Sequence, residues 1–101
     1  MAKMTKKDII RTIQEHEAHA WKEYNRHNYI TAPEGLSYFE ECERQKEDTE
    51  SCRLRHAWHA IYELLESIGE TPDNDLPEAQ EGFTYAREIY NQCKPYNRES
   101  A

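Results

Sequence analysis

One stretch near the middle of the chain, residues 53–69, carries the only unbroken helical stripe of apolar side chains. Apolar residues recur there at steps of four, three, four and three: Leu54, Trp58, Ile61, Leu65 and Ile68. This spacing places them on one face of an α-helix, with Ala57 and Leu64 widening that face. Gly69 follows, and Pro72 makes continuation of the helix unfavourable. We therefore expect a core helix with Trp58 buried on its inner face.

The first part of the chain has a similar pattern over residues 6–28. Thr5 is a suitable N-cap, and Asp8 follows it at the spacing of a capping box. Residues 38–52 hold few apolar side chains, but oppositely charged residues at helical spacing favour a helix there as well. We expect that helix to continue into the core helix, so that residues 38–68 form one long helix. A break near Thr49 is the alternative.

Residues 77–93 form a third amphipathic segment, with Asp75 as the expected cap and Pro77 in the first turn. No stretch shows the period of two that a strand requires. The 101 residues suit a single domain. The sequence therefore predicts an all-α fold, an antiparallel three-helix bundle with a long central helix, in which residues 1–101 form a single helical domain. The expected helices span about 6–28, 38–68 and 77–93, with loops at about 29–37 and 69–76.

The opening of the chain and its cysteines indicate a cytoplasmic protein. Residues 1–7 include three lysines and lead into no apolar run, so neither a signal peptide nor a membrane span is expected. The three cysteines form no close pair, which favours reduced thiols. The net charge of −7 disfavours direct binding to nucleic acid or to an anionic membrane.

Negative charge is concentrated between His56 and Ala86, where there is no lysine or arginine. The acidic residues of interest there are Glu63, Glu66, Glu70, Asp73, Asp75, Glu78 and Glu81. In the predicted bundle they gather at the end where the second helix meets the third. Such a surface fits a basic protein partner, for example one that handles nucleic acid. The alternative is that these charges only keep the protein soluble.

The opposite end of the predicted bundle is rich in aromatic residues: Trp21, Tyr29, Tyr38 and Phe39. Tyrosine and tryptophan often anchor protein interfaces, and the thin core would gain apolar burial from a homodimer. In the alternative reading these side chains close the end of the core.

A metal site is the remaining candidate. The predicted register brings His16 level with Cys52, and Cys52 level with Cys93, and zinc would suit imidazole and thiolate ligands. The alternative is a hydrogen-bonded core histidine with cysteines as small apolar groups.

No phosphate-binding glycine loop, nucleophile elbow or catalytic triad pattern is present. We therefore expect a small acidic, non-enzymatic interaction protein, an inhibitor or adaptor that engages a basic protein surface. Short acidic helical proteins of this kind are often encoded by phages and mobile elements. The alternative function is a metal-binding helical bundle that uses the histidine and cysteine residues above.

Overall fold

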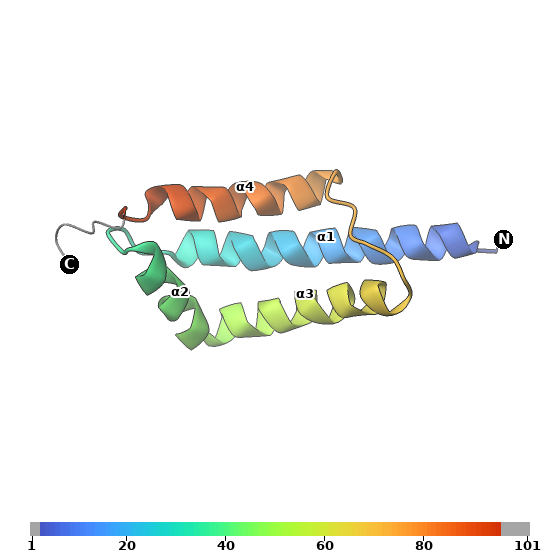
Figure 1. Cartoon of the computed structure of the whole chain (residues 1–101), viewed down its shortest axis with the longest axis horizontal. Helices are drawn as coiled ribbons and strands as arrows, with labels where there is room; N and C mark the ends of the chain where they lie inside the picture. The colour runs from blue at the N-terminus through green and yellow to red at the C-terminus, as the bar shows by residue number, and fades with distance from the viewer. Residues whose placement is uncertain (1–2, 96–101) are drawn as a thin grey trace.

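The computed structural model describes residues 3–95, which form four α-helices and no strand of a sheet (Figure 1). The helices are α1 (Lys6–Thr31), α2 (Tyr38–Glu47), α3 (Thr49–Ser67) and α4 (Pro77–Gln92). The prediction of an all-helical fold is confirmed. The molecule is elongated, with dimensions of 62 × 25 × 23 Å.

The start of α1 follows the predicted capping box. The Thr5 hydroxyl accepts a hydrogen bond from the Asp8 N–H, and the Asp8 carboxylate accepts one from the Thr5 N–H, each at 3.1 Å. These bonds satisfy two backbone donors that a helix otherwise leaves free. α4 begins at Pro77 as expected, but its N-cap residue is Leu76, which provides no side-chain cap. The expectation of an Asp75 cap was therefore wrong.

The single helix expected over residues 38–68 is interrupted at Asp48, so the prediction of one continuous helix was wrong. Asp48 has an extended backbone, with φ −82° and ψ 109°. Its N–H donates to the Arg44 carbonyl at 3.1 Å and closes α2. Its carboxylate accepts from the Ser51 N–H at 3.1 Å and caps α3. One residue thus ends one helix and begins the next, which is the alternative that the sequence offered.

α1 occupies the centre of the molecule, between α4 on one side and α3 on the other (Figure 1). α3 runs back along α1, α4 runs in the same direction as α1, and α2 leaves the end of α1 at an angle. Within residues 3–95, α1 packs extensively against both α3 and α4, whereas α3 and α4 share no such contact. The sequence placed its second helix at the centre, and the first helix takes that position instead.

Aromatic rings fill the space where the three long helices approach one another. The ring of Trp21 on α1 lies 4.9 Å from that of Trp58 on α3 and 5.3 Å from that of Phe83 on α4. Gly82 on α4 is buried against Trp21. Trp58 itself is only half-buried. Among residues 3–95, the buried apolar residues are Ala18, Leu65, Ala79 and Ile89, and two of these are alanines.

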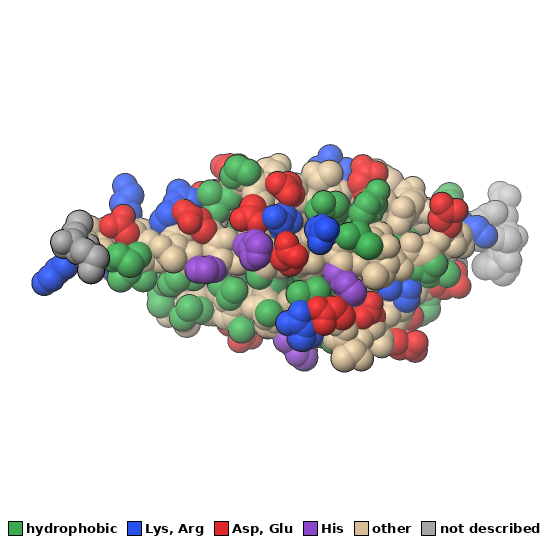
Figure 2. Space-filling model, turned by 180° about the vertical axis from the view of Figure 1, so that it is seen from behind, with side chains coloured by type: hydrophobic (Ala, Val, Ile, Leu, Met, Phe, Trp, Pro, Cys, Tyr) green, Lys and Arg blue, Asp and Glu red, His purple; other side chains and the backbone are tan. Residues whose placement is uncertain are grey.

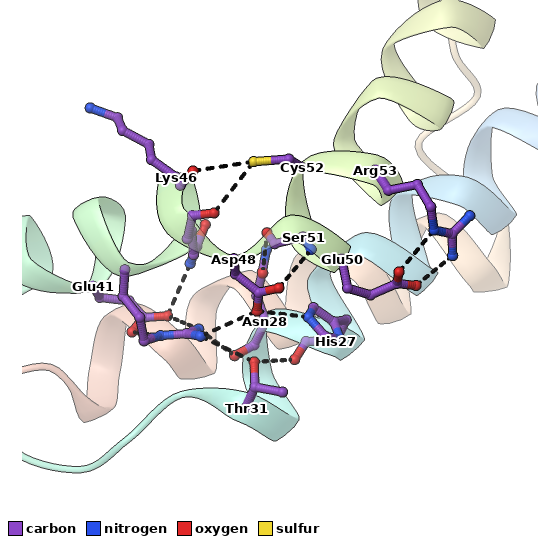
Figure 3. A network of polar contacts seen from close by, with 12 residues as sticks. His27, Asn28, Thr31, Glu41, Lys46, Asp48, Glu50, Ser51, Cys52 and Arg53 are labelled. Atoms are coloured by element: carbon purple, nitrogen blue, oxygen red, sulfur yellow. Dashed lines mark hydrogen bonds and ion pairs between the residues drawn. The ribbon is translucent and has the colours of Figure 1, made fainter.

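Polar side chains are buried where α1, α2 and α3 meet (Figure 3). Arg44 donates to both carboxylate oxygens of Glu41, at 2.9 and 2.6 Å, and Glu41 is 1% exposed. Ser51 donates to the side-chain oxygen of Asn28 at 2.6 Å. His27 contacts the Asp48 carboxylate at 2.9 Å. Because buried polar groups are costly unless they are paired, this network favours the observed joint between α2 and α3 over a straight helix.

Candidate interaction surface

An apolar stripe is exposed where the second half of α3 lies beside the first half of α1. Its largest members are Ile9 on α1, Leu64 on α3 and Ile68 directly after α3, with exposed fractions of 48%, 46% and 47%. Ile13 on α1 is half-buried, and Ala57 and Ala60 extend the exposed row on α3. We call Ile9, Ile13, Ala57, Ala60, Leu64 and Ile68 the α1–α3 stripe. On α3 it spans three turns, or about 17 Å.

The register of α1 and α3 explains why these residues meet. Trp58 donates from its ring nitrogen to Glu17 at 2.6 Å, which fixes one level of the two oppositely directed helices. The same register brings Ile9 to the level of Glu66, within one turn of Leu64 and Ile68. Figure 2 shows the result from behind, where hydrophobic side chains gather along the lower edge toward the N-terminal end, over α3 and the adjoining part of α1.

The sequence placed Leu64 and Ile68 in the core, and the structure shows them at the surface. The buried side of α3 contains Ser51 and Leu65. A single neighbouring helix cannot cover the whole apolar arc of α3, so one edge of that arc stays outside. The signal was present in the sequence, because seven apolar residues on one short helix make an arc wider than a typical core-facing stripe.

The acidic residues predicted to bind a partner are not all free. Arg11 donates to Asp73 at 2.6 Å, and Lys22 and His19 both contact the same oxygen of Glu78, at 2.8 and 2.7 Å. The hydrogen bond from Arg11 is the main reason that the pKa of Asp73 lies below its ordinary value. The bonds from Lys22 and then His19 likewise lower the pKa of Glu78. Basic side chains of α1 therefore neutralise part of the acidic segment.

The remaining acidic residues differ in their surroundings. Glu63 lies 3.4 Å from His59. Glu70 lines a shallow cavity together with basic residues of the first turns of α1. Among the described residues, Glu66, Asp75 and Glu81 have no ion-pair partner within 4 Å. The predicted acidic surface is thus reduced to a few unpaired carboxylates, because nearby basic side chains balance the charge of the others.

The predicted aromatic patch is partly assembled. Tyr38 and Phe39 are 50% and 73% exposed, and Tyr90, which the sequence analysis did not include, is 62% exposed beside them. The rings of Tyr38 and Tyr90 meet edge to face at 5.1 Å. Tyr29 is exposed at 37% and packs against a tyrosine of α4. Trp21 belongs to the interior instead, because it lies between the helices.

The structure does not bring His16, Cys52 and Cys93 together. In the part of the chain from residue 3 to 95, no three histidine, cysteine or acidic side chains are arranged to hold a metal ion. The physical reason is the break at Asp48, which changes the register of α3 against α1 from the one expected for a continuous helix. The middle of α3, rather than Cys52, lies level with Glu17, the neighbour of His16. His16 itself is exposed.

No protein-family model, no curated protein and no solved structure matches this chain. Between residues 3 and 95, no helix has the length and apolar character needed to cross a membrane. Function is therefore inferred from the surface itself.

Proposed function

We propose that the protein is a non-enzymatic interaction protein, an adaptor or inhibitor, that binds an amphipathic helix of a basic partner along the α1–α3 stripe. The observation that carries this proposal is the exposure of Ile9, Leu64 and Ile68, which the register of α1 and α3 places within about one helical turn of one another. In this proposal α1, α3 and α4 act as one antiparallel three-helix bundle, and the partner supplies a fourth helix.

The chemistry of the stripe favours a helix as its ligand. The stripe presents a row of exposed apolar side chains on two packed helices, and a helix with anchors at i, i+3, i+4 and i+7 presents a matching apolar row. Burial contributes about 25 cal/mol per Å² of apolar surface removed from water. Isolated exposed apolar residues are ordinary, but a contiguous row of them is typical of a binding surface.

The charge of the chain favours a basic partner. The net charge of −7 attracts positively charged proteins over distances of about one Debye length, which is about 8 Å at physiological salt. Glu66, Asp75 and Glu81 lack ion-pair partners among the described residues and contribute most directly. Asp73 and Glu78 contribute less because Arg11 and Lys22 already contact them. A protein that handles nucleic acid has a surface of the required sign.

A pair of synthetic helical peptides tests the proposal. One peptide combines leucine with lysine, and the other has the same pattern with glutamate in place of lysine. Amide chemical shifts of the isotope-labelled protein report where each peptide binds. We expect the lysine peptide to bind along the stripe and to bind at least about tenfold more tightly than the glutamate peptide, a difference of about 1.4 kcal/mol. High salt should reduce this preference.

Two variants with matched chemistry give the control. Leu64→Ser with Ile68→Ser should abolish binding of the lysine peptide, whereas Tyr90→Ser, at the other end of the molecule, should leave it unchanged. Shifts that cluster around Tyr38, Phe39 and Tyr90 instead of the stripe would contradict the proposal. Equal affinity for the two peptides would contradict the part of the proposal that makes the partner basic.

A further inference from the structure

An apolar hollow of about 540 Å³ lies at the end of the molecule where α4 stops and α2 begins (Figure 1). Its apolar side chains are Tyr38 and Phe39 on α2, Tyr90 on α4, and Pro95. We call these four residues the end patch. The α1–α3 stripe lies toward the other end of the molecule, so the end patch has no part in the proposed function.

The two walls of the hollow are joined by the backbone. The Lys94 N–H donates to the Leu36 carbonyl at 2.8 Å, which ties the segment after α4 to the segment before α2. The rings of Tyr38 and Tyr90 meet across this junction, edge to face, at 5.1 Å. The hollow is therefore formed within one chain, and a partner does not have to order it.

The end patch combines a projecting ring with a hollow. Phe39 is 73% exposed, the highest value of any large apolar residue between residues 3 and 95. The hollow beside it is lined by Tyr90 and Pro95. A two-fold interface needs this combination, because the same patch on both chains meets itself and must be complementary to itself.

We propose that the end patch binds a second copy of this chain, end to end, about a two-fold axis. The Phe39 ring of each chain enters the hollow of the other and contacts Tyr90 there. The contact removes from water the aromatic surface that the monomer exposes at this end. Homodimer interfaces are more apolar than the rest of a protein surface and are enriched in aromatic residues, as the end patch is.

The distribution of charge permits this contact. Two copies with a net charge of −7 repel each other. Residues 37–40 and 90–95, which border the hollow, contain one acidic and one basic residue, Glu40 and Lys94, so their charges cancel. Asp75 precedes α4, whereas Tyr90 lies near its far end, about 20 Å along the helix. End-to-end contact therefore separates the acidic segments of the two chains by more than the Debye length of about 8 Å.

The size of the end face limits the strength of the dimer. The two shorter dimensions of the molecule, 25 and 23 Å, allow a contact of roughly 600 Å² per chain, or about 1,200 Å² in total. This area is at the lower end of the range for specific interfaces. We therefore expect a reversible dimer with a Kd weaker than about 1 μM.

Sedimentation equilibrium of the full-length chain, from about 1 μM to about 1 mM, tests the proposal. We expect monomers and dimers but no larger species, because a two-fold contact is closed. X-ray scattering at the high end of this range should give a longest dimension about twice the 62 Å of one chain. A dimer with the length of one chain would be side by side and would overturn the proposal.

Two substitutions test the end patch itself. Phe39→Ala should weaken the dimer by at least about tenfold, because the two-fold axis removes the ring from both sides of the interface. The ring is mostly exposed, so the helices should remain intact, which circular dichroism checks. Lys94→Glu should also weaken the dimer, since it makes both copies of the patch acidic, and high salt should restore part of this loss.

The matched control is Leu64→Ser with Ile68→Ser, which removes exposed apolar side chains of the α1–α3 stripe. It should change the Kd of the dimer by less than about twofold, because the stripe is distant from the end patch. A loss equal to that of Phe39→Ala would place the interface at the stripe and overturn the proposal. A chain that stays monomeric over the whole concentration range would also overturn it. Dimers that form only after removal of residues 96–101 would assign the hollow to that segment instead of to a second copy.

Discussion

The ring N–H of Trp58 donates to the carboxylate of Glu17 at 2.6 Å, and Glu17 is 4% exposed. This contact joins α3 to α1 near the middle of the bundle and fixes the register on which the α1–α3 stripe depends. Burial raises the pKa of Glu17, and the hydrogen bond from Trp58 offsets part of that rise. A buried carboxylate is therefore held in place by one strong donor.

Replacing Glu17 tests this contact. Glu17→Ala leaves the Trp58 N–H without its partner and should cost about 1–3 kcal/mol in the free energy of unfolding. Glu17→Gln keeps an acceptor and should cost less. Urea unfolding of the two variants at neutral pH measures the difference. Equal stability of the alanine and glutamine variants would show that the hydrogen bond contributes nothing.

The pH dependence of the same site has a definite sign. Because the folded pKa of Glu17 is raised above the ordinary value of 4.5, its carboxyl stabilises the fold below that value. This contribution is lost as the pH rises through the raised pKa. The stability of Glu17→Gln relative to the wild type should therefore increase from acidic to neutral pH. Denaturant unfolding at a series of pH values measures it, and a difference that stays constant would contradict the burial argument.

We predict that position 82 must be glycine because the ring of Trp21 leaves no room there for a side chain. A Cβ atom at position 82 would overlap with a ring carbon of Trp21, closer than atoms pack. Gly82→Ala should therefore destabilise the fold by about 1–3 kcal/mol, although alanine favours helix formation. In a Trp21→Leu background the contact with the ring is removed and only the tight approach to the Lys22 backbone nitrogen, at 3.2 Å, remains, so the same substitution should cost less. Thermal unfolding of the four proteins measures this reduction, and an equal cost in both backgrounds would show that Trp21 is not the reason for the glycine.

Asp48 should be a pH-sensitive cap of α3. Its pKa is lowered first by the backbone N–H of Ser51 and then by His27. A lowered pKa stabilises the fold above the ordinary value of 3.8, and this contribution is lost as the pH falls through the folded pKa. Asp48→Ala should cost about 1–2 kcal/mol at neutral pH. That cost should shrink in acid, and a cost that is independent of pH would contradict it.

The buried carboxylate of Glu41 is predicted to depend on Arg44. Arg44→Met would leave Glu41, which is 1% exposed, without the cation that binds both of its oxygens. Removal of one partner from a buried ion pair typically costs about 3–5 kcal/mol. Adding Glu41→Gln to the Arg44→Met variant should restore a large part of this loss. Chemical denaturation of the single and double variants forms the test, and strict additivity would exclude a coupling between the two side chains.

Local signals predicted the ends of the helices better than their packing. The Thr5 and Asp8 capping box and the start at Pro77 follow from residue types at fixed offsets. Gly69 adopts φ +77°, the left-handed conformation expected just after a helix. Such features depend on a few neighbouring residues, so the sequence contains all the information that they need.

The break at Asp48 was harder to predict because it depends on distant residues. Asp48 is a good cap by type, but Thr49 and the charged residues around it are also compatible with a continuous helix. His27 of α1 favours the break, since it contacts the Asp48 carboxylate at 2.9 Å. With the break missed, the expected register of α3 against α1 was wrong, and so were the expected metal ligands.

The central place of α1 bears on how the chain is made. α1 is synthesised before either of the helices that pack against it, and synthesis proceeds at about 5–20 residues per second. As α3 leaves the ribosome its docking surface already exists, and the same is true of α4 some seconds later. The apolar faces of α1 are thus covered in two steps, first by α3 and then by α4.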